Sequence, residues 1–442
     1  MVFPEEYTAM PSSNRRQFLQ STTAGTLSLA ASAQAVAGSA VSPLRVALVG
    51  CGGRGTYLAG VFQSNPQVTL SWVCDVDTGR LARGKRAGRD HTRTSNDIRE
   101  VLRDETLDAV IVATPDHWHA PASILACEAG KHVYVEKPCS HNIREGRLLV
   151  ESAHRNKCIV QHGTQVRSTT MMIDAVKLLR SGIIGDVKVS KAWNIQRRGN
   201  IGKGKPGTPP STLDYNNWVG PAEMIPYQAN RVHGGWHWWY HFGTGDMGND
   251  GVHDIDYARW GLGVTTHPSL ISAAGGKFFF DDDQQFPDTQ QVAFQYPGNG
   301  GVEDQKMLIY EQRLWSTNYP HNVDSGVEFY GTAGQMFLSR RGKIAVYGPR
   351  NKRIDVKVVP EEQNAEKHVA NFLHCVRTGT APNAEIEIGH LTTSLCHLGN
   401  MANRLGRSFR FDPRTERVID DKDADALVAR RYREHWGTPR GA

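Results

Sequence analysis

The sequence lacks the patterns that would place it in several common functional classes. Its seven cysteines are scattered and contain no C-x-x-C pair, so neither a disulfide framework nor a zinc site is indicated. No internal repeat is present, and no Lys/Arg run interleaved with aromatic residues points to nucleic acid. Beyond residue 43, no apolar run reaches the roughly 20 residues of a membrane span. We therefore expect reduced, buried thiols, no nucleic-acid partner and no membrane span in the mature chain.

What the chain does contain is enough apolar sequence for two ordinary cores. Of its 442 residues, 39% are hydrophobic and 22% charged, and domains usually run to about 100–200 residues. The net charge of +6 is carried partly by a basic stretch at 197–205, which we expect to be a solvated lid or a subunit-contact arm. The ten tryptophans favour a ligand with flat faces, such as a sugar ring.

The N-terminus resembles a twin-arginine export signal. Arg15 and Arg16 precede an apolar pair, a weakly apolar Ala/Ser/Thr-rich stretch follows, and an A-x-A cleavage pattern spans 35–37. The alternatives are a disordered leader or an uncleaved anchor. We predict a signal and linker over 1–43 and a periplasmic or extracytoplasmic location, reached by a route that carries folded proteins.

Apolar runs alternate with helical patterns after this leader. The runs at 44–49, 68–73, 109–113 and 132–135 are typical of buried strands. Strands of this kind, separated by helices, indicate a parallel sheet that is covered on both faces. We predict an α/β domain over 44–164.

The pattern changes after residue 164. Short runs between 269 and 346 are typical of antiparallel strands, and helices are expected at about 362–377 and 387–404. We predict an α+β substrate and oligomerisation domain over 165–415 with a large, mainly antiparallel open sheet, followed by a C-terminal tail over 416–442.

Residues 50–55 form the pattern G-x-G-x-x-G directly between a predicted strand and a predicted helix. In a dinucleotide-binding turn, such glycines permit the tight turn, let backbone amides approach a pyrophosphate, and let helix and strand pack closely. The predicted cofactor contacts in the turn are Gly50, Cys51, Gly52, Gly53, Arg54 and Gly55. We therefore predict that the first domain is a Rossmann domain. The alternative is a glycine-rich turn in an unrelated α/β fold.

Asp75 ends the second predicted strand, about 20 residues after the glycines. A carboxylate there can accept hydrogen bonds from the adenosine ribose hydroxyls, and it would repel a 2′-phosphate. We therefore expect NAD in preference to NADP, while Arg54 and Arg80 leave NADP open.

Two further segments produce a resemblance to a known family. Thr114-Pro115-Asp116-His117-Trp118-His119 follows the third strand, and Glu136-Lys137-Pro138 follows the fourth. Together with the glycine turn, they resemble the signature of the glucose-fructose oxidoreductase / inositol dehydrogenase / MocA (Gfo/Idh/MocA) family over about 44–415. The resemblance implies an NAD(P)-dependent oxidoreductase acting on CH–OH groups, with further cofactor contacts from Thr114, Pro115, Asp116, His119, Glu136 and Lys137. It also implies that Lys137 orients the substrate and that a cis bond precedes Pro138.

A segment of the second domain resembles the family's aspartate and histidine spaced four residues apart. His253 matches the catalytic histidine, a natural base for a hydroxyl proton as hydride leaves carbon. Asn249 stands where the family usually has Asp, and Asp250 and Asp246 are the candidates to replace that carboxylate. The predicted catalytic residues are Lys137, His253, Asn249 and Asp250. The alternatives are a surface lysine and a histidine satisfied by its neighbours.

Other polar and aromatic residues are candidates for substrate contacts, namely Gln165, Arg167, Trp193, Trp236 and Tyr240. Each aromatic residue has core or interface packing as its alternative. His237 and His241 are spaced like two metal ligands on one helical face, but no H-E-x-x-H pattern accompanies them. We predict no metal.

The main hypothesis is hydride transfer to or from a sugar, cyclitol or sugar derivative by a homo-oligomer, a dimer or a tetramer, with a tightly bound and recycled cofactor. The second is an NAD-dependent glycoside hydrolase or lyase that oxidises its substrate transiently. Lys137 counts against this second hypothesis, since the hydrolytic relatives tend to lack it, and Asn249 counts for it. The third is a non-catalytic sugar or dinucleotide sensor.

Overall fold

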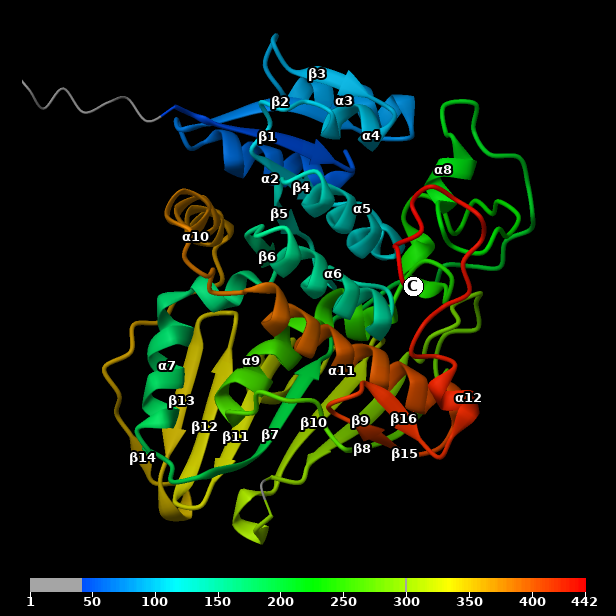
Figure 1. Cartoon of the computed structure of the whole chain (residues 1–442). Coiled ribbons are helices and arrows are strands. Elements are labelled where there is room, and N and C mark those ends of the chain that lie inside the picture. Colours follow the sequence, from blue (N-terminus) through cyan, green and yellow to red (C-terminus); the bar gives the residue numbers. More distant parts are fainter. Residues whose placement is uncertain (1–41, 299) are drawn as a thin grey trace, which may run out of the picture. The chain divides into compact units, whose positions relative to one another are not determined.

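The computed structural model describes residues 42–298 and 300–442, so the arginine pair and the A-x-A pattern of the predicted leader lie outside the described residues. The first part of the described chain forms a six-stranded parallel sheet in the order β3-β2-β1-β4-β5-β6 (Figure 1). Its strands are β1 (Leu44–Val49), β2 (Val68–Cys74), β3 (Arg93–Ser95), β4 (Ala109–Val112), β5 (His132–Val135) and β6 (Val160–His162). The strand order changes direction between β1 and β4, and doubly wound sheets bind dinucleotides at that point.

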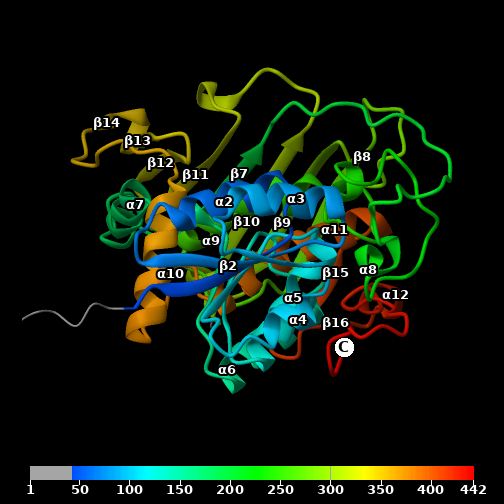
Figure 2. The same ribbon diagram turned by 90° about the horizontal axis from the view of Figure 1, so that it is seen from above.

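Helices cover both faces of this sheet, which explains why its central strands β1, β4 and β5 are mostly apolar. One face carries α2 (Gly53–Gln63), α3 (Thr78–Ala87) and the distant α10 (Ala365–Thr378); the other carries α4 (Ile98–Leu102), α5 (Asp116–Glu128) and α6 (Ile143–Arg155). Seen from above, α2 and α3 lie on one side of the strands and α4, α5 and α6 on the other (Figure 2). Phe372 of α10 packs edge-on against Phe62 of α2, with ring centroids 6.0 Å apart.

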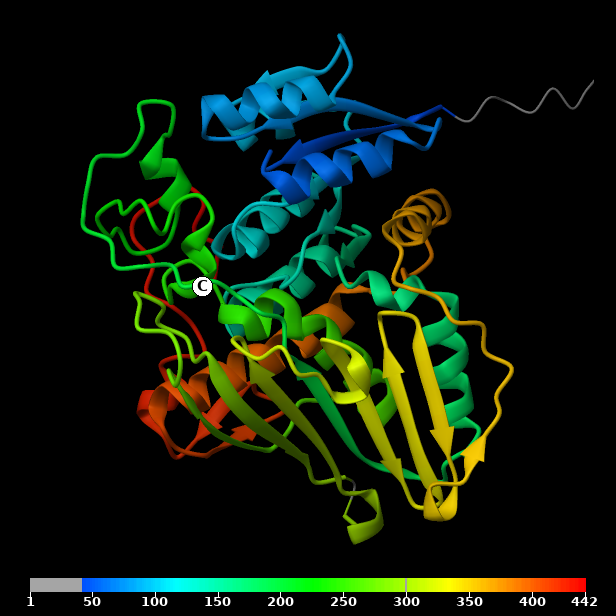
Figure 3. The ribbon, with the colours of Figure 1, turned by 180° about the vertical axis from the view of Figure 1, so that it is seen from behind.

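The second sheet has ten strands in the order β14-β13-β12-β11-β7-β10-β9-β8-β15-β16. They are β7 (Val187–Asn194), β8 (Leu270–Gly276), β9 (Thr289–Tyr296), β10 (Lys306–Arg313), β11 (Ser325–Gly331), β12 (Gly334–Ser339), β13 (Lys343–Tyr347), β14 (Arg353–Ile354), β15 (Phe409–Asp412) and β16 (Arg417–Ile419). Helices α7 (Thr170–Arg180), α9 (Val252–Leu262) and α11 (Ile386–Leu405) lie on one face, and Figure 3 shows the other face without a covering helix. The predicted fold class is confirmed. The exception to antiparallel pairing is β7 with β10, which run parallel.

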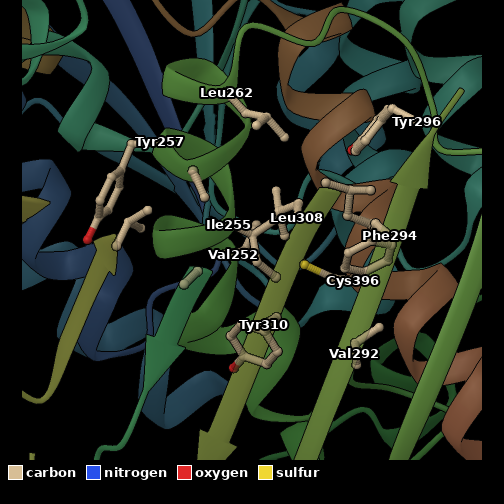
Figure 4. Close-up of a cluster of buried hydrophobic side chains, with 14 of the residues drawn as sticks. Val252, Ile255, Tyr257, Leu262, Val292, Phe294, Tyr296, Leu308, Tyr310 and Cys396 are labelled. Carbon is tan, nitrogen blue, oxygen red and sulfur yellow. The ribbon is translucent and has the colours of Figure 1, made fainter. Parts of the chain in front are cut away.

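Helix α9 is anchored to the middle of this sheet. Val252 and Ile255 share one buried cluster with Leu308 and Tyr310 of β10 (Figure 4). Burying a large apolar side chain is worth about 1.5–3 kcal/mol. The first turn of α9, which carries His253, is therefore held on a rigid platform.

The remaining helices are short: α8 (Tyr215–Val219), α12 (Lys422–Asp425), the 3₁₀ turns η1 (Gln165–Ser168), η2 (Gly235–Trp238), η4 (Val302–Asp304), η5 (Pro320–Asn322) and η6 (Pro349–Asn351), and a π-helix, η3 (Met247–Gly251). No helix in the described ranges is both long and apolar enough to cross a bilayer. All seven cysteines are free thiols, and six of them are buried.

A long excursion between β7 and η3, residues 195–246, reaches back to the first sheet. The Thr78 amide donates to the Thr212 carbonyl at 2.9 Å, and the Asp214 amide donates to the Val76 carbonyl at 3.0 Å. His233 Nε2 lies 3.1 Å from the Asp77 carboxylate. This 195–246 segment therefore holds the end of β2 to the second domain.

Candidate active site

A cavity of about 570 Å³ opens at the carboxyl ends of β1, β2, β4 and β5, between the two domains. Its volume lies in the range of small-molecule and cofactor sites. The structure brings these predicted residues together in its lining: Gly50, Gly52, Gly53, Arg54, Asp75, Thr114, Pro115, Asp116, His119, Glu136, Lys137, Gln165, Trp236, Asn249, Asp250 and His253.

The glycine turn has the shape that a pyrophosphate needs. Gly50 has a φ of 94°, and a Cβ atom there would lie 2.5 Å from the Ala113 carbonyl oxygen. A Cβ atom at Gly55 would lie 1.9 Å from the Gly50 carbonyl oxygen. Helix α2 begins at Gly53 with no side-chain cap and no acidic residue in its first turn, so its first N–H groups are available to an anion. The turn fits NAD, which supplies the hydride acceptor when it is bound.

Asp75 is fixed at the end of β2 by backbone amides. Its carboxylate accepts hydrogen bonds from the Cys51 amide at 2.7 Å and from the Asp77 amide at 2.9 Å. Each oxygen keeps a further lone pair for a ribose hydroxyl. The Cys51 side chain, in contrast, is buried beneath the turn with Sγ 3.6 Å from the Cys74 carbonyl oxygen, so this residue shapes the turn without lining the cavity.

The segment after β5 is held by the segment after β4. The peptide bond between Lys137 and Pro138 is cis, as the resemblance implies. The two ring nitrogens of His119 lie 2.6 Å from the Pro138 carbonyl oxygen and 2.8 Å from the Thr114 carbonyl oxygen. Arg54 Nε donates to Glu136 at 2.8 Å, so Glu136 ties this strand end to the glycine turn.

Lys137 reaches across the cavity to the second domain. Its Nζ donates to Asn249 Oδ1 at 3.0 Å and also to the Asn249 carbonyl oxygen. Asn249 lies in the π-helix η3, an irregularity that is frequent at functional sites, and its Nδ2 donates to Asp246 at 3.0 Å. Lys137 therefore has an amide partner where the family usually supplies a carboxylate.

The two candidate replacement carboxylates are occupied by arginines. Arg198 pairs with both Asp246 and Asp250, and Arg340 Nη2 donates to Asp250 at 3.1 Å. Burial opposes its charge, but Arg340, Lys137 and Arg198 hold the pKa of Asp250 below its usual value. Arg198 engages one carboxylate oxygen of Asp250 and Arg340 engages the other, so neither oxygen is left open to a substrate proton. Asp250 therefore balances charge and does not act as a base.

His253 is the best-placed proton acceptor. Its side chain is 5% exposed, and neither ring nitrogen has a hydrogen-bond partner among the described residues. Burial, Arg340 and Lys137 lower its pKa well below the usual value, so the imidazole is neutral and free to accept a proton. His253 and Lys137 therefore give the same cavity a neutral imidazole and a cation.

His237, which the sequence offered only as a metal-ligand candidate, gives the cavity a second imidazole. His237 lines the same cavity, its ring lies 3.6 Å from the Trp236 ring, and neither of its nitrogens has a partner among the described residues. Burial and Lys137 lower its pKa to about 3. Only 235–238 is helical here, so His237 and His241 do not share the helical face that metal ligands would need.

Three of the substrate candidates lie away from the cavity. Arg167 is buried in an ion pair with Asp256 at 2.7 Å. Trp193 is 1% exposed and stacks on Phe337 in a separate core cluster. Tyr240 packs its ring 4.4 Å from that of Phe286, outside the cavity. Trp193 and Tyr240 follow the alternative of internal packing, and Arg167 is held in an internal ion pair.

Arg198, Arg340 and Trp436 also line or border the cavity without having been predicted. Arg198 belongs to the basic stretch expected to be solvated, but its guanidinium is paired with the buried Asp246 and the partly buried Asp250. Trp436 belongs to the predicted tail, 299 residues beyond Lys137 in sequence and part of the same cavity. No local sequence pattern predicts that these three residues lie at the cavity, because the residues they contact are distant in sequence.

Comparison with known families covers almost all of the described chain. Residues 44–164 match the Gfo/Idh/MocA profile described as "Oxidoreductase family, NAD-binding Rossmann fold". Residues 168–438 match the profile described as "Oxidoreductase family, C-terminal alpha/beta domain".

Individual relatives agree with these profiles. The chain is 26% identical to the scyllo-inositol 2-dehydrogenase (NAD(+)) of Bacillus subtilis over 77% of this chain and 88% of that protein. It is 30% identical to a glycosyl hydrolase family 109 protein of Saccharopolyspora erythraea, over only 34% of this chain and 35% of that protein. The aldose-aldose oxidoreductase of Caulobacter crescentus shares the fold, with a TM-score of 0.64 at 16% identity over 84% of this chain and all of that one. The chain therefore belongs to the Gfo/Idh/MocA oxidoreductase family, and it is an NAD-dependent oxidoreductase.

Proposed function

We propose that the protein transfers hydride between its nicotinamide cofactor and a CH–OH group of a sugar, cyclitol or sugar derivative. The observation that carries the proposal is that the glycine turn, Lys137 and the unpartnered imidazole of His253 share one cavity. In the oxidising direction, His253 takes the hydroxyl proton while Lys137 holds the oxygen and stabilises the developing negative charge.

The charges around the cavity support a neutral polyol. Arg198 and Arg340 are each paired with carboxylates, so neither is free to hold an acidic substrate. Trp236 gives the lining an aromatic face of the kind on which sugar rings pack. The inositol dehydrogenase and aldose oxidoreductase relatives act on substrates of this class by name.

The test is a panel of sugars, cyclitols and glycosides added one at a time to purified, NAD-loaded protein. At least one compound should change the nicotinamide absorbance, and K137M should make that change much slower while NAD stays bound. If no polyol alters the absorbance, or if K137M responds like the wild type, the proposal is wrong.

A recycled cofactor forms part of the proposal. The 195–246 segment bridges the two domains at the end of β2, and the cavity is lined by side chains from both of them. Such enclosure favours a dinucleotide that stays bound while one substrate is oxidised and another reduced. NAD that survives exhaustive dialysis supports this, and free exchange within the dialysis time refutes it.

His237 favours a second candidate function, glycoside cleavage by transient oxidation. Once a ring hydroxyl has been oxidised to a ketone, the neighbouring C–H becomes acidic. His237 can accept that proton while the C–O bond to the aglycone breaks and the departing oxygen takes a proton from solvent. Water then adds to the resulting double bond, and returned hydride restores the alcohol, so no net redox change remains. H237N should oxidise a glycoside normally but release no aglycone. Equal release by H237N and the wild type, or none by either, removes this candidate.

We also propose export through the twin-arginine route and assembly into a dimer or tetramer. The motif around Arg15 and Arg16 supports export, and replacing both with lysine should retain the protein in the cytoplasm. The uncovered face of the ten-stranded sheet, where Lys191 and Glu311 pair at 3.0 Å, supports face-to-face assembly. Light scattering of the purified protein tests the assembly, and a monomer would refute it.

A further inference from the structure

The last residues of the chain complete the cavity wall at its adenosine end. Trp436 lines the cavity together with Asn96 and Ile98, which lie beyond the end of β3. Asn96 Nδ2 donates to the Asp75 carbonyl oxygen at 2.8 Å, so this wall adjoins the carboxylate that suits the adenosine ribose. The indole is therefore on the adenosine side of the glycine turn, away from Lys137.

We propose that Trp436 is an adenine-binding residue and that the C-terminal segment 429–442, which carries it, limits the release of the dinucleotide. The inference rests on the proposed function only in requiring NAD in this cavity. Aromatic side chains bind nucleobases by stacking, with about 1–3 kcal/mol per base, and the adenine is the flat, uncharged part of NAD best suited to an indole.

The indole is held in place on several sides. Its Nε1 donates to Asn217 Oδ1 at 3.2 Å. The Arg99 guanidinium lies 4.4 Å from the ring centroid, and the Trp118 ring lies 5.4 Å away. The ring remains partly exposed, so it is a fixed surface that a ligand can still reach. A side chain that is already ordered loses little entropy on binding.

The segment is anchored both to the 195–246 segment and to the Rossmann domain. Arg433 Nε donates to the Gly220 carbonyl at 2.6 Å and its Nη1 to Asn216 Oδ1 at 2.7 Å, both in the 195–246 segment. Arg430 pairs with Glu145 of α6 at 2.7 Å and donates to the His117 carbonyl at 2.9 Å. A Cβ atom at Gly437 would lie 2.6 Å from the Trp118 ring, so the backbone itself packs closely there.

These contacts make the segment a strap that joins the Rossmann domain to the 195–246 segment. A dinucleotide lodged beneath it leaves only when the contacts of Arg430 and Arg433 open. Charge-assisted hydrogen bonds of this kind are stronger than neutral ones, so opening is infrequent. The strap thus accounts for slow release independently of the chemistry at Lys137.

The experiment compares W436A with R431A, since Arg431 is exposed on the same segment and makes no hydrogen bond or ion pair among the described residues. Full-length proteins are loaded with NAD, and the release rate is measured after dilution into an NAD-scavenging solution. Equilibrium binding of ADP, which carries adenosine but no nicotinamide, is measured in parallel. W436A should release NAD on the order of tenfold faster and bind ADP more weakly by a similar factor, and W436F should recover most of both effects. R431A should behave as the wild type.

The outcomes separate the two proposals. If the wild type binds neither NAD nor ADP, both proposals fail. If the wild type retains NAD and W436A releases it at the R431A rate, the role of Trp436 is refuted and the proposed function stands. If W436A weakens NAD but not ADP, the adenine assignment is refuted. Thermal unfolding of the cofactor-free variants identifies a folding defect, in which case W436F alone decides through its ADP affinity.

Discussion

The two halves of the cavity differ in whether backbone or side-chain atoms form them. The cofactor half is mostly backbone, with a glycine turn, the first amides of α2 and a carboxylate held by two further amides. The substrate half is made of side chains from segments far apart in sequence, with Lys137 after β5, Asn249 in η3 and Arg340 after β12. A site made of backbone needs particular residues at fixed spacing, whereas a site made of side chains needs only that the fold bring them together.

The largest effect on NAD binding should come from adding a side-chain atom to the glycine turn in the cofactor half. G55A places a Cβ atom 1.9 Å from the Gly50 carbonyl oxygen, whereas a Cβ atom at Gly53 meets nothing within 4 Å. We expect G55A to abolish NAD binding and to lower the free energy of unfolding by about 1–3 kcal/mol or more. G53A should keep or slightly raise that free energy, because alanine favours the helix. Equal stability of the two variants in urea denaturation would contradict the turn geometry.

The next effect concerns the cation of the side-chain half. The K137M variant should slow hydride transfer by about 10²–10⁴-fold. It lacks the Nζ that Asn249 holds in place and that stabilises negative charge on the substrate oxygen. Binding of NAD should change little, since the glycine turn carries the phosphates. Single-turnover reduction of the bound cofactor measures the rate, and K205M, at an exposed lysine, is the matched control. A K137M rate within about threefold of the control would rule out this role.

The pH dependence tests the electrostatics of the same half. Burial, Arg340 and Lys137 lower the pKa of His253 below its usual 6.5, so its neutral base form persists as the pH falls. The oxidation rate should therefore hold from about pH 8 to about pH 6. Stopped-flow rates across this range would show it. An acidic limb centred near the usual histidine pKa would mean that the imidazole is solvated in the working enzyme.

The smallest effect should come from N249D. A carboxylate at this position faces Lys137 but also Asp246, whose oxygen lies 3.0 Å from Asn249 Nδ2. Attraction to one and repulsion from the other largely cancel, and burial already raises the pKa of Asp246. We expect a change in rate of about threefold or less and a loss of stability of about 1 kcal/mol. A much larger gain in rate would show that the amide limits catalysis.

The backbone-made half was predictable to a large extent. The spacing of Gly50 and Gly55, the position of Asp75 and the strand-turn-helix context are local, and the structure assembles them at one switch point. The substrate half was predictable only where the resemblance supplied residues, as for Lys137 and His253. Trp193 and Arg167 look like ligand-binding residues in sequence, and burial in separate packing environments removed them from the cavity.

The same contrast separates what the amino-acid order determined from what the tertiary structure decided. Periodicity and glycine spacing determined a parallel α/β domain with an anion-binding turn, because those features depend on neighbouring residues. Tertiary structure alone decided that Asp250 is held by Arg198 and Arg340, and that His237 and Trp436 line the cavity. The charge and the burial at one point of the structure depend on residues that are remote in sequence. Only folding brings those residues together.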